Sequence, residues 1–285
     1  MQAAAVPAGT SATSAEVVAT RASGAAGEAG VVLVTLRHTG RLNAMSRAMW
    51  QQLRAVFKDI QRSHGVRCVL IEGEGAAFCA GGDISEYPGF RFDAAALREF
   101  HEGDVWGGLS AMLDCDVPIV AHIAGACMGA GVEIASCCDV RVAHAAARFG
   151  APIARLGFPM APREAQLVAG ALGEVTARQM LLEAATFGAD EMFARGFLSR
   201  VVAGAQEARA EALASACRIA ALAPGAARLN KQTLRALKAP PPFDPSQHHH
   251  ASPGHHHATD PYAYADSAEH REGITAFLEK RPPVF

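Results

Sequence analysis

The chain has 285 residues, and its 26 lysines and arginines nearly balance its 28 acidic residues, for a formal net charge of −2. This balance provides no electrostatic basis for binding nucleic acid or a membrane surface. No apolar run reaches the ~20 residues of a membrane-spanning helix. A chain of this length can bury roughly 75% of its unfolded surface, which is enough for one large domain.

The N-terminus and the cysteines indicate where the protein resides. Residues 1–15 are rich in alanine, serine, threonine and glycine, and they lack the basic start and apolar stretch of a secretory signal. We expect this segment to be disordered. The 7 cysteines form no C-x-x-C pair and no zinc-ligand spacing, which is typical of reduced thiols. The sequence therefore predicts a cytoplasmic protein with no metal site.

Residues 16–202 are predicted to alternate between strands and helices. The expected strands are Val17–Ala22, Val31–Arg37, Val66–Ile71, Val117–Ile123 and Val140–Ala143, and the expected helices are Ser46–Ser63, Ala94–Leu113 and the segment around Glu133. The first two strands flank a glycine-containing segment, which indicates a hairpin. Ser46 is suited to cap its helix. Alternation of this kind predicts an α/β core.

The pattern changes after about residue 202. Helical spacing continues through Gln206–Leu222, Pro224–Leu237 and Asp266–Lys280, with no strand-like run among them. Between the last two lies a loop over 239–260 that is rich in proline and histidine. Such a tract can bind metal adventitiously, but its composition is that of a linker. Residues 203–285 are thus expected to form a C-terminal helical region.

The segment Ile123–Asp139 carries the strongest chemical signal. It runs from a strand through a glycine-rich turn into a helix, and the first N–H groups of a helix form a ready anion site. Glu133 lies three residues after Ala130, close to one turn of helix, so its carboxylate is expected beside those N–H groups. Donors for an oxyanion next to an acid suggest chemistry at a carbonyl group. The plainer interpretation is a packed junction in which Glu133 complements the helix dipole.

Another glycine-rich turn, earlier in the chain, strengthens the catalytic interpretation. The segment Glu72–Ile84 follows an apolar run and again leads through small residues to an acid, Asp83. Two strand ends that each open into such a turn can supply one backbone N–H apiece to the same oxygen atom. This pairing is more specific than either turn alone.

These motifs resemble the enoyl-CoA hydratase/isomerase (crotonase) superfamily. The similar segments are Arg41–Met45, Phe78–Ile84, Ile123–Glu133, Cys138–Asp139, Phe149–Gly150 and Arg271–Lys280. They follow the family's order from about residue 16 to the C-terminus. The resemblance implies an α/β fold with a crotonase-like β-β-α spiral core and a C-terminal α-helical trimerisation region.

The resemblance also implies a set of site residues. The oxyanion hole for an acyl thioester would be formed by the backbone N–H groups of Ala80 and Ala130, with Glu133 as the acid. Coenzyme A enters as part of the substrate rather than as a tightly bound cofactor. The residues that the resemblance assigns to its binding are Leu42, Ala44, Ala80, Gly82, Asp83, Ile84, Gly129, Phe277 and Lys280.

One departure from the family's pattern limits the functional assignment. The second glutamate of the family's hydratases falls on Ile153, and an aliphatic side chain cannot transfer a proton. Seven nearby polar residues are candidates for compensation or for surface and structural pairs: Glu86, Glu99, His101, Glu102, Arg155, Arg163 and Glu164. The sequence does not choose among them.

The resemblance implies an enzyme that hydrates a 2-enoyl-CoA and catalyses the reverse dehydration, or a single-acid variant of it. The charge balance predicts no nucleic-acid or membrane partner. Other chemistry of the superfamily stays open: isomerisation, decarboxylation, carbon–carbon cleavage, thioester hydrolysis or non-catalytic binding of acyl-CoA. A homotrimer or homohexamer is expected, because Ile274, Phe277 and Leu278 give the last helix an apolar face that needs a partner.

Overall fold

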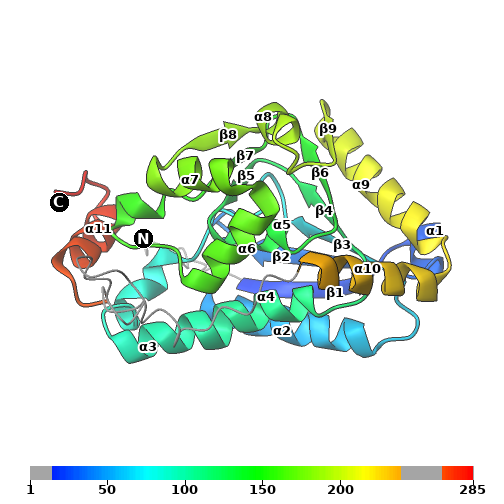
Figure 1. Ribbon diagram of the computed structural model, residues 1–285, viewed down its shortest axis with the longest axis horizontal. Coiled ribbons are helices and arrows are strands. Elements are labelled where there is room, and N and C mark those ends of the chain that lie inside the picture. Colours follow the sequence, from blue (N-terminus) through cyan, green and yellow to red (C-terminus); the bar gives the residue numbers. More distant parts are fainter. Residues whose placement is uncertain (1–14, 239–264, 285) are drawn as a thin grey trace, which may run out of the picture.

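The computed structural model describes residues 15–238 and 265–284 (Figure 1). The histidine-rich loop lies outside these ranges, as do residues 1–14. Ala15, which was expected in the disordered segment, instead begins the first strand. None of the helices in the described ranges is long and apolar enough to cross a membrane.

A six-stranded sheet forms the centre of the molecule. Its strands, in spatial order, are β1 (Ala15–Arg21), β2 (Val31–His38), β3 (Cys68–Gly73), β4 (Ile119–Ile123), β6 (Val140–His144) and β9 (Arg200–Val202). The β1–β2 pair is antiparallel, as the predicted hairpin requires, and a short helix, α1 (Gly24–Glu28), joins the two strands. The other neighbours are parallel.

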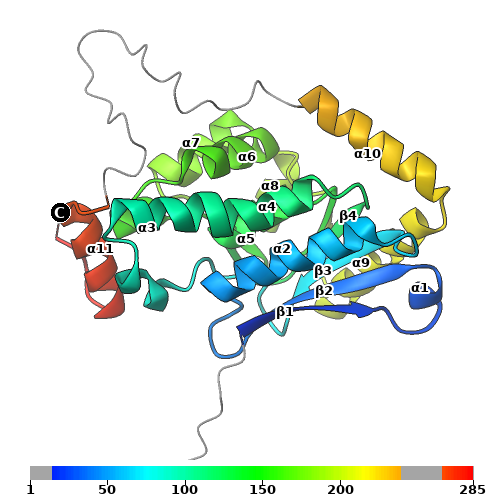
Figure 2. The same cartoon turned by 90° about the horizontal axis from the view of Figure 1, so that it is seen from below.

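Helices cover both faces of this sheet (Figure 2). One face packs against α2 (Arg47–Arg62) and α4 (Trp106–Leu113), and the other packs against α9 (Ala205–Ala220). The Ser46 hydroxyl accepts a hydrogen bond from the Met49 N–H at 3.2 Å and so caps α2 as predicted. The first helix after residue 202, α9, therefore packs directly on the sheet.

A smaller sheet lies beside the main one, and each of its strands has three residues. It consists of β5 (Ala126–Met128), β7 (Arg148–Gly150) and β8 (Thr186–Gly188). The chain passes from β4 to β5 at Gly125, where φ is +52° and an added Cβ would lie 2.1 Å from the Ala76 carbonyl oxygen. Only glycine fits this turn. Four further helices follow: α5 (Ala130–Ser136), α6 (Pro162–Leu172), α7 (Glu174–Leu182) and α8 (Ala189–Ala194).

The helix predicted over Ala94–Leu113 is not a regular α-helix. It consists of α3 (Ala94–Arg98), a π-helical segment (Glu99–Val105) and α4. Two short 3₁₀ helices, Ile84–Gly89 and Ile153–Leu156, lie near the same end of the molecule. A π-helical turn changes the rotational phase of the residues that follow it.

The last two helices lie at opposite ends of the molecule (Figures 1 and 2). The first, α10 (Pro224–Lys238), projects at one end, and α11 (Ala268–Leu278) docks at the other against the 3₁₀ helix Ile153–Leu156. At Gly273 an added Cβ would lie 2.3 Å from the Leu156 carbonyl carbon, so this close approach requires glycine. Ile274 is fully buried against Tyr87 and Phe158. The expectation that it needs a partner subunit is therefore wrong.

Candidate active site

The first glycine-rich turn along the chain, within Glu72–Ile84, runs alongside the segment at Arg41–Met45. The Met45 N–H donates to the Gly81 carbonyl at 2.8 Å, and the Asp83 N–H donates to the Met45 carbonyl at 2.9 Å. The Ala80 N–H donates to the Leu42 carbonyl at 3.0 Å. A ligand oxygen at Ala80 would therefore have to share or replace this bond.

Asn43 holds this segment in its conformation. Leu42 and Asn43 both have positive φ, 47° and 60°. The Asn43 side chain accepts from the His38 N–H at 3.1 Å and donates to the Ala77 carbonyl at 2.8 Å. Ala44 is buried, and its carbonyl lies 2.6 Å from Nδ1 of His38. The backbone expected to contact coenzyme A is thus rigidly tied to the first turn.

The second glycine-rich turn along the chain, within Ile123–Asp139, places the start of α5 against the first turn. The Met128 N–H donates to the Cys79 carbonyl at 2.8 Å, and an added Cβ at Gly131 would lie 2.6 Å from that same carbonyl oxygen. Gly129, with φ of +46°, is the residue before α5, which makes Ala130 the first residue of the helix. The N–H of a first helical residue has no acceptor within its helix. Ala80 and Ala130, predicted from separate motifs, therefore lie side by side.

Both turns open into one cavity of about 200 Å³. Glycine and alanine backbone forms one side, and aromatic rings form much of the rest. The lining residues are Trp50, Ala80, Gly81, Gly82, Ile84, Tyr87, Arg91, Phe100, His101, Val105, Met128, Gly129, Ala130, Glu133, Pro152, Ile153, Leu156, Phe158, Pro159, Met160, Glu164 and Phe277. Asp83 is not among them, because its carboxylate caps the next 3₁₀ helix through Ser85.

Two carboxyl groups face this cavity, Glu133 from α5 and Glu164 from α6, and they are only 7% and 3% exposed. Burial raises the pKa of Glu133 well above its usual range, and the negative charge of Glu164 raises it further, while Arg91 opposes the change. Burial likewise raises the pKa of Glu164 to about 8, again opposed by Arg91. Both shifts favour the protonated forms of these buried carboxyl groups.

A chain of polar contacts links Glu164 to the C-terminal helix. Nδ1 of His101 lies 2.8 Å from Oε1 of Glu164, and Nε2 of His101 lies 3.4 Å from a terminal nitrogen of Arg91. Nε of Arg91 donates to Nε2 of His270 on α11 at 3.3 Å. The Arg91 guanidinium also stacks 3.9 Å from the centre of the Phe158 ring. Burial lowers the pKa of His101 well below its usual value, and Arg91 adds to this effect.

The tail residues behave differently from one another. Phe277 lines the cavity from α11 of the same chain. Lys280 lies beyond the end of α11, is exposed and is not among the lining residues. Arg91 was not identified from the sequence, where it is a lone arginine in an irregular stretch. The aromatic residues close to Arg91 in the sequence are the only local signal that could have pointed to it.

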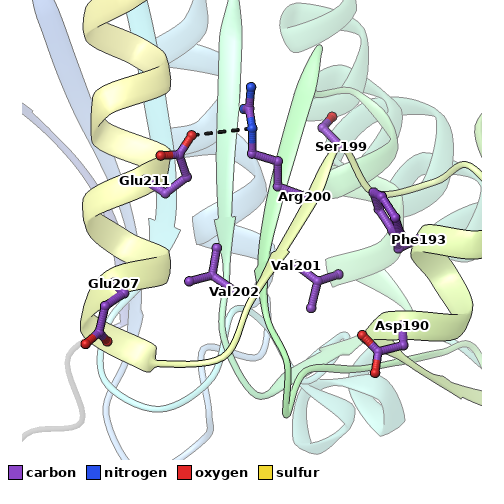
Figure 3. Close-up of a pocket in the computed structure, with 8 residues that line it drawn as sticks. All are labelled: Asp190, Phe193, Ser199, Arg200, Val201, Val202, Glu207 and Glu211. Atoms are coloured by element: carbon purple, nitrogen blue, oxygen red, sulfur yellow. Dashed lines mark ion pairs between the residues drawn. The ribbon is translucent and has the colours of Figure 1, made fainter.

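A second hollow, of about 740 Å³, lies at the β9 edge of the main sheet, between α8, β9 and α9 (Figure 3). Its residues are Asp190, Phe193, Ser199, Arg200, Val201, Val202, Glu207 and Glu211. The Arg200 guanidinium pairs with Glu211 at 3.4 Å, which leaves Asp190 and Glu207 as negative groups on opposite sides of β9. This charge disfavours phosphate-bearing ligands.

Comparison with known proteins identifies the family. The profile of the enoyl-CoA hydratase/isomerase family matches residues 26–285. The chain belongs to this family. A probable enoyl-CoA hydratase of Mycobacterium bovis is 30% identical over 256 residues, which cover 90% of this chain and 94% of that protein. A mevalonyl-coenzyme A hydratase of Beauveria bassiana is 30% identical over 267 residues, covering 90% and 91%.

Structural comparison agrees with this membership. The crystal structure of an enoyl-CoA hydratase/carnithine racemase from Magnetospirillum magneticum aligns with a TM-score of 0.72 and 32% identity, covering 90% of this chain and 92% of that one. The predicted α/β class with a crotonase-like spiral core is thereby confirmed. Helices α10 and α11 supply the expected C-terminal helical region.

Within this enoyl-CoA hydratase/isomerase family member, the structure separates the candidates for a second acid. Ile153 lines the cavity, so its position faces the site although its side chain is inert. The other candidates, apart from His101 and Glu164, make contacts elsewhere: Arg155 donates to the Ala184 carbonyl, Arg163 pairs with Glu102, and Glu86 and Glu99 both contact Arg47. Among the described residues that line the cavity, only Glu164 brings a second carboxyl group.

Proposed function

We propose that this protein is a hydro-lyase that adds water to the double bond of a 2-enoyl-CoA thioester and catalyses the reverse dehydration. One observation carries the proposal: the buried Glu133 carboxyl shares a cavity with Ala80 and Ala130, whose backbone belongs to two converging turns. The names of the relatives, two of them hydratases, support the same reaction class.

The geometry suits the charge changes of this reaction. When water adds to the β-carbon, electron density moves to the thioester oxygen. The N–H groups of Ala80 and Ala130 would hold this charge, with the Ala80 N–H shared with or released from the Leu42 carbonyl. The water proton passes to a carboxylate, and the α-carbon receives a proton from a carboxyl group, so that H and OH add across the double bond. Glu133, whose pKa is raised well above its usual range by burial, would perform one of these transfers.

Coenzyme A would lie along the backbone that leads into the cavity. We assign its contacts to Leu42, Ala44, Gly129, Phe277, Lys280 and the turn Ala80–Ile84. Leu42 is 57% exposed, so this edge is open to a large ligand, whereas Phe277 is half-exposed at the cavity mouth. The aromatic lining would hold the acyl chain. No tightly bound cofactor is required for this chemistry.

A panel of thioesters tests the reaction. Crotonyl-CoA and longer 2-enoyl-CoA esters are incubated with the full chain, and products are read by mass spectrometry for gain of one water. We expect hydration. Loss of carbon dioxide, release of free CoA, cleavage of a carbon–carbon bond or a shifted double bond would assign one of the other reactions. Calorimetric binding without any product would identify a non-catalytic acyl-CoA-binding protein.

We also propose that the chain forms a homotrimer or a dimer of trimers through α10. This helix contacts the body through polar side chains: Lys231 pairs with Asp139 at 2.8 Å, and Arg235 pairs with Asp116 at 2.7 Å. Its leucines instead face outward, with exposed fractions of 62% at Leu229, 60% at Leu234 and 78% at Leu237. An apolar face turned away from its own core is suited to a second copy of the chain.

The oligomer is testable by sedimentation velocity at micromolar concentration. We expect a trimer or hexamer for the wild type, and smaller species when Leu234 and Leu237 are both replaced by Glu, because charges on this face would oppose its burial. Leu182→Glu on α7 is the matched control, since Leu182 is 75% exposed elsewhere. A monomeric wild type contradicts the proposal.

A further inference from the structure

We propose that Glu164 is the second acid–base group of this site and that His101, Arg91 and His270 position it. This inference rests on the proposed hydration reaction, which needs two proton transfers: one from the water that attacks the β-carbon, and one to the α-carbon. In the family pattern the second carboxyl group comes from position 153, which is Ile here. The structure brings a carboxyl group to the same cavity from a different element, α6.

The fold turns Glu164 inward for a local reason. It lies in the first turn of α6, which begins at Pro162 and packs against α5, the helix that carries Glu133. The adjacent Arg163 points elsewhere, pairing with Glu102 at 3.1 Å. Glu164 is left with 3% exposure, and a carboxyl group is rarely buried this deeply without a specific role or partner.

The hydrogen-bond chain determines which Glu164 oxygen is able to carry a proton. An arginine nitrogen can only donate, so Nε2 of His101 accepts from Arg91, and the proton of the neutral imidazole is on Nδ1. Nδ1–H therefore donates to Oε1 of Glu164. A proton on Glu164 is then carried by Oε2, the oxygen that His101 does not engage. His270 is fixed similarly, because its Nδ1 donates to the Ala265 carbonyl and its Nε2 accepts from Arg91.

The groups that act on Glu164 are Glu133, His101 and Arg91, which line the same cavity, and Glu102, which lies outside it and acts through its charge. Arg91 and the His101 N–H favour the ionised form, whereas the two other carboxyl groups disfavour it. Two buried carboxyl groups in one cavity tend to hold one proton between them. In hydration, the carboxylate takes a proton from water as its oxygen bonds to the β-carbon, and the carboxylic acid gives its proton to the α-carbon. The pair keeps one proton throughout.

A purely structural Glu164, serving only as the partner of His101, predicts different results. Glu164→Gln keeps the acceptor for Nδ1–H but cannot transfer a proton. We expect kcat for crotonyl-CoA hydration to fall about 10²–10³-fold while KM changes only a few-fold. The control Glu174→Gln removes an exposed carboxyl group at the start of α7 and should leave kcat unchanged. If Glu164→Gln retains kcat within about twofold, Glu164 is not an acid–base group.

Restoring an acid from position 153 gives a sharper test. In the Glu164→Gln background, Ile153→Glu should recover at least ten-fold in kcat, because Ile153 lines the same cavity. The same substitution in the wild type should lower kcat, since it adds a third carboxyl group. Absence of recovery in a double variant that still binds crotonyl-CoA contradicts the proposal.

A titration separates this inference from the proposed reaction. In the full chain labelled with ¹³C at the glutamate carboxyl groups, we expect Glu133 and Glu164 to titrate as a coupled pair, and Glu133 to titrate at lower pH after Glu164→Gln. If the wild type hydrates no 2-enoyl-CoA but shows this coupling, the proposed reaction fails while the shared-proton pair stands. If Glu133 titrates at the same pH in both proteins, the pair is overturned even in an active hydratase.

Substitutions at His101 test whether the hydrogen-bond chain positions Glu164. His101→Asn keeps a side-chain N–H donor near Oε1 of Glu164, whereas His101→Leu removes it. We expect the Leu variant to lose about ten-fold or more in kcat and to shift the acidic limb of the pH profile upward, because the ionised form of Glu164 loses a donor. The Asn variant should recover part of both effects. Identical profiles for the two variants would exclude a positioning role.

Discussion

Glu133→Gln is expected to lower turnover of a 2-enoyl-CoA by about 10²–10⁴-fold, the range that a positioned acid–base group contributes. Glutamine keeps the shape and hydrogen-bonding capacity of the side chain but cannot exchange a proton. Affinity for CoA esters should change little, because the proposed oxyanion donors at Ala80 and Ala130 are backbone groups. Steady-state kinetics with crotonyl-CoA, combined with calorimetry, measures both quantities.

A comparison of Glu133→Gln with a control variant shows whether Glu133 is the group that transfers the proton. Glu86→Gln is a suitable control, since Glu86 accepts a hydrogen bond from the Arg47 N–H outside the cavity. Its kcat should stay close to that of the wild type. An active wild type that is indifferent to Glu133→Gln would mean that Glu133 is structural, and the role of acid would then pass to Glu164 alone.

The stability of the folded chain is expected to fall as pH rises through the range between 4.5 and about 8. The pKa of Glu164 is raised in the folded state, so the folded chain keeps a proton that the unfolded chain has already lost. The associated stability is complete below the unfolded value and is lost as pH approaches the folded value. One pKa unit corresponds to about 1.4 kcal/mol, so the loss by pH 8 is on the order of 4 kcal/mol.

Glu164→Gln removes the contribution of Glu164 to this dependence, because glutamine does not ionise. We expect the variant to be more stable than the wild type at pH 8 and similar to it at pH 4.5, as measured by denaturant unfolding at each pH. Glu174→Gln is the matched control and should follow the wild-type profile, because its carboxyl group is exposed. Parallel profiles for the wild type and Glu164→Gln would show that Glu164 titrates as an ordinary surface carboxyl group.

The same burial that lowers stability at alkaline pH is what makes the carboxyl pair useful. A buried carboxyl group whose pKa lies near neutral pH can both accept and donate a proton at the pH of the cell. Arg91 limits this effect: it lowers the pKa of both Glu133 and Glu164, and it is itself held by aromatic stacking and by two histidines. The C-terminal helix α11 thus contributes to the electrostatics of the site through His270.

Much of the main sheet was predictable from sequence because its signals are local. The strands β2, β4 and β6 are apolar runs bounded by turn residues, and Ser46 marks the start of α2. The strands β5, β7 and β8 were not predicted, because three residues are too few to show the alternation that identifies a strand. The π-helical segment at Glu99–Val105 was also missed, since its residues suit an α-helix equally well.

The two glycine-rich turns, the candidate Glu133 and the family could be predicted from the sequence, because each depends on residues that are close in the chain. That Glu164 faces the cavity and Arg163 does not becomes evident only in the folded chain. Neighbouring residues on a helix point about 100° apart, and the packing of α6 on α5 selects which of them is buried. His101 and His270 come from distant segments, and Ile274 is covered within its own chain. Contacts of this range exist only after the chain has folded, so no local pattern encodes them.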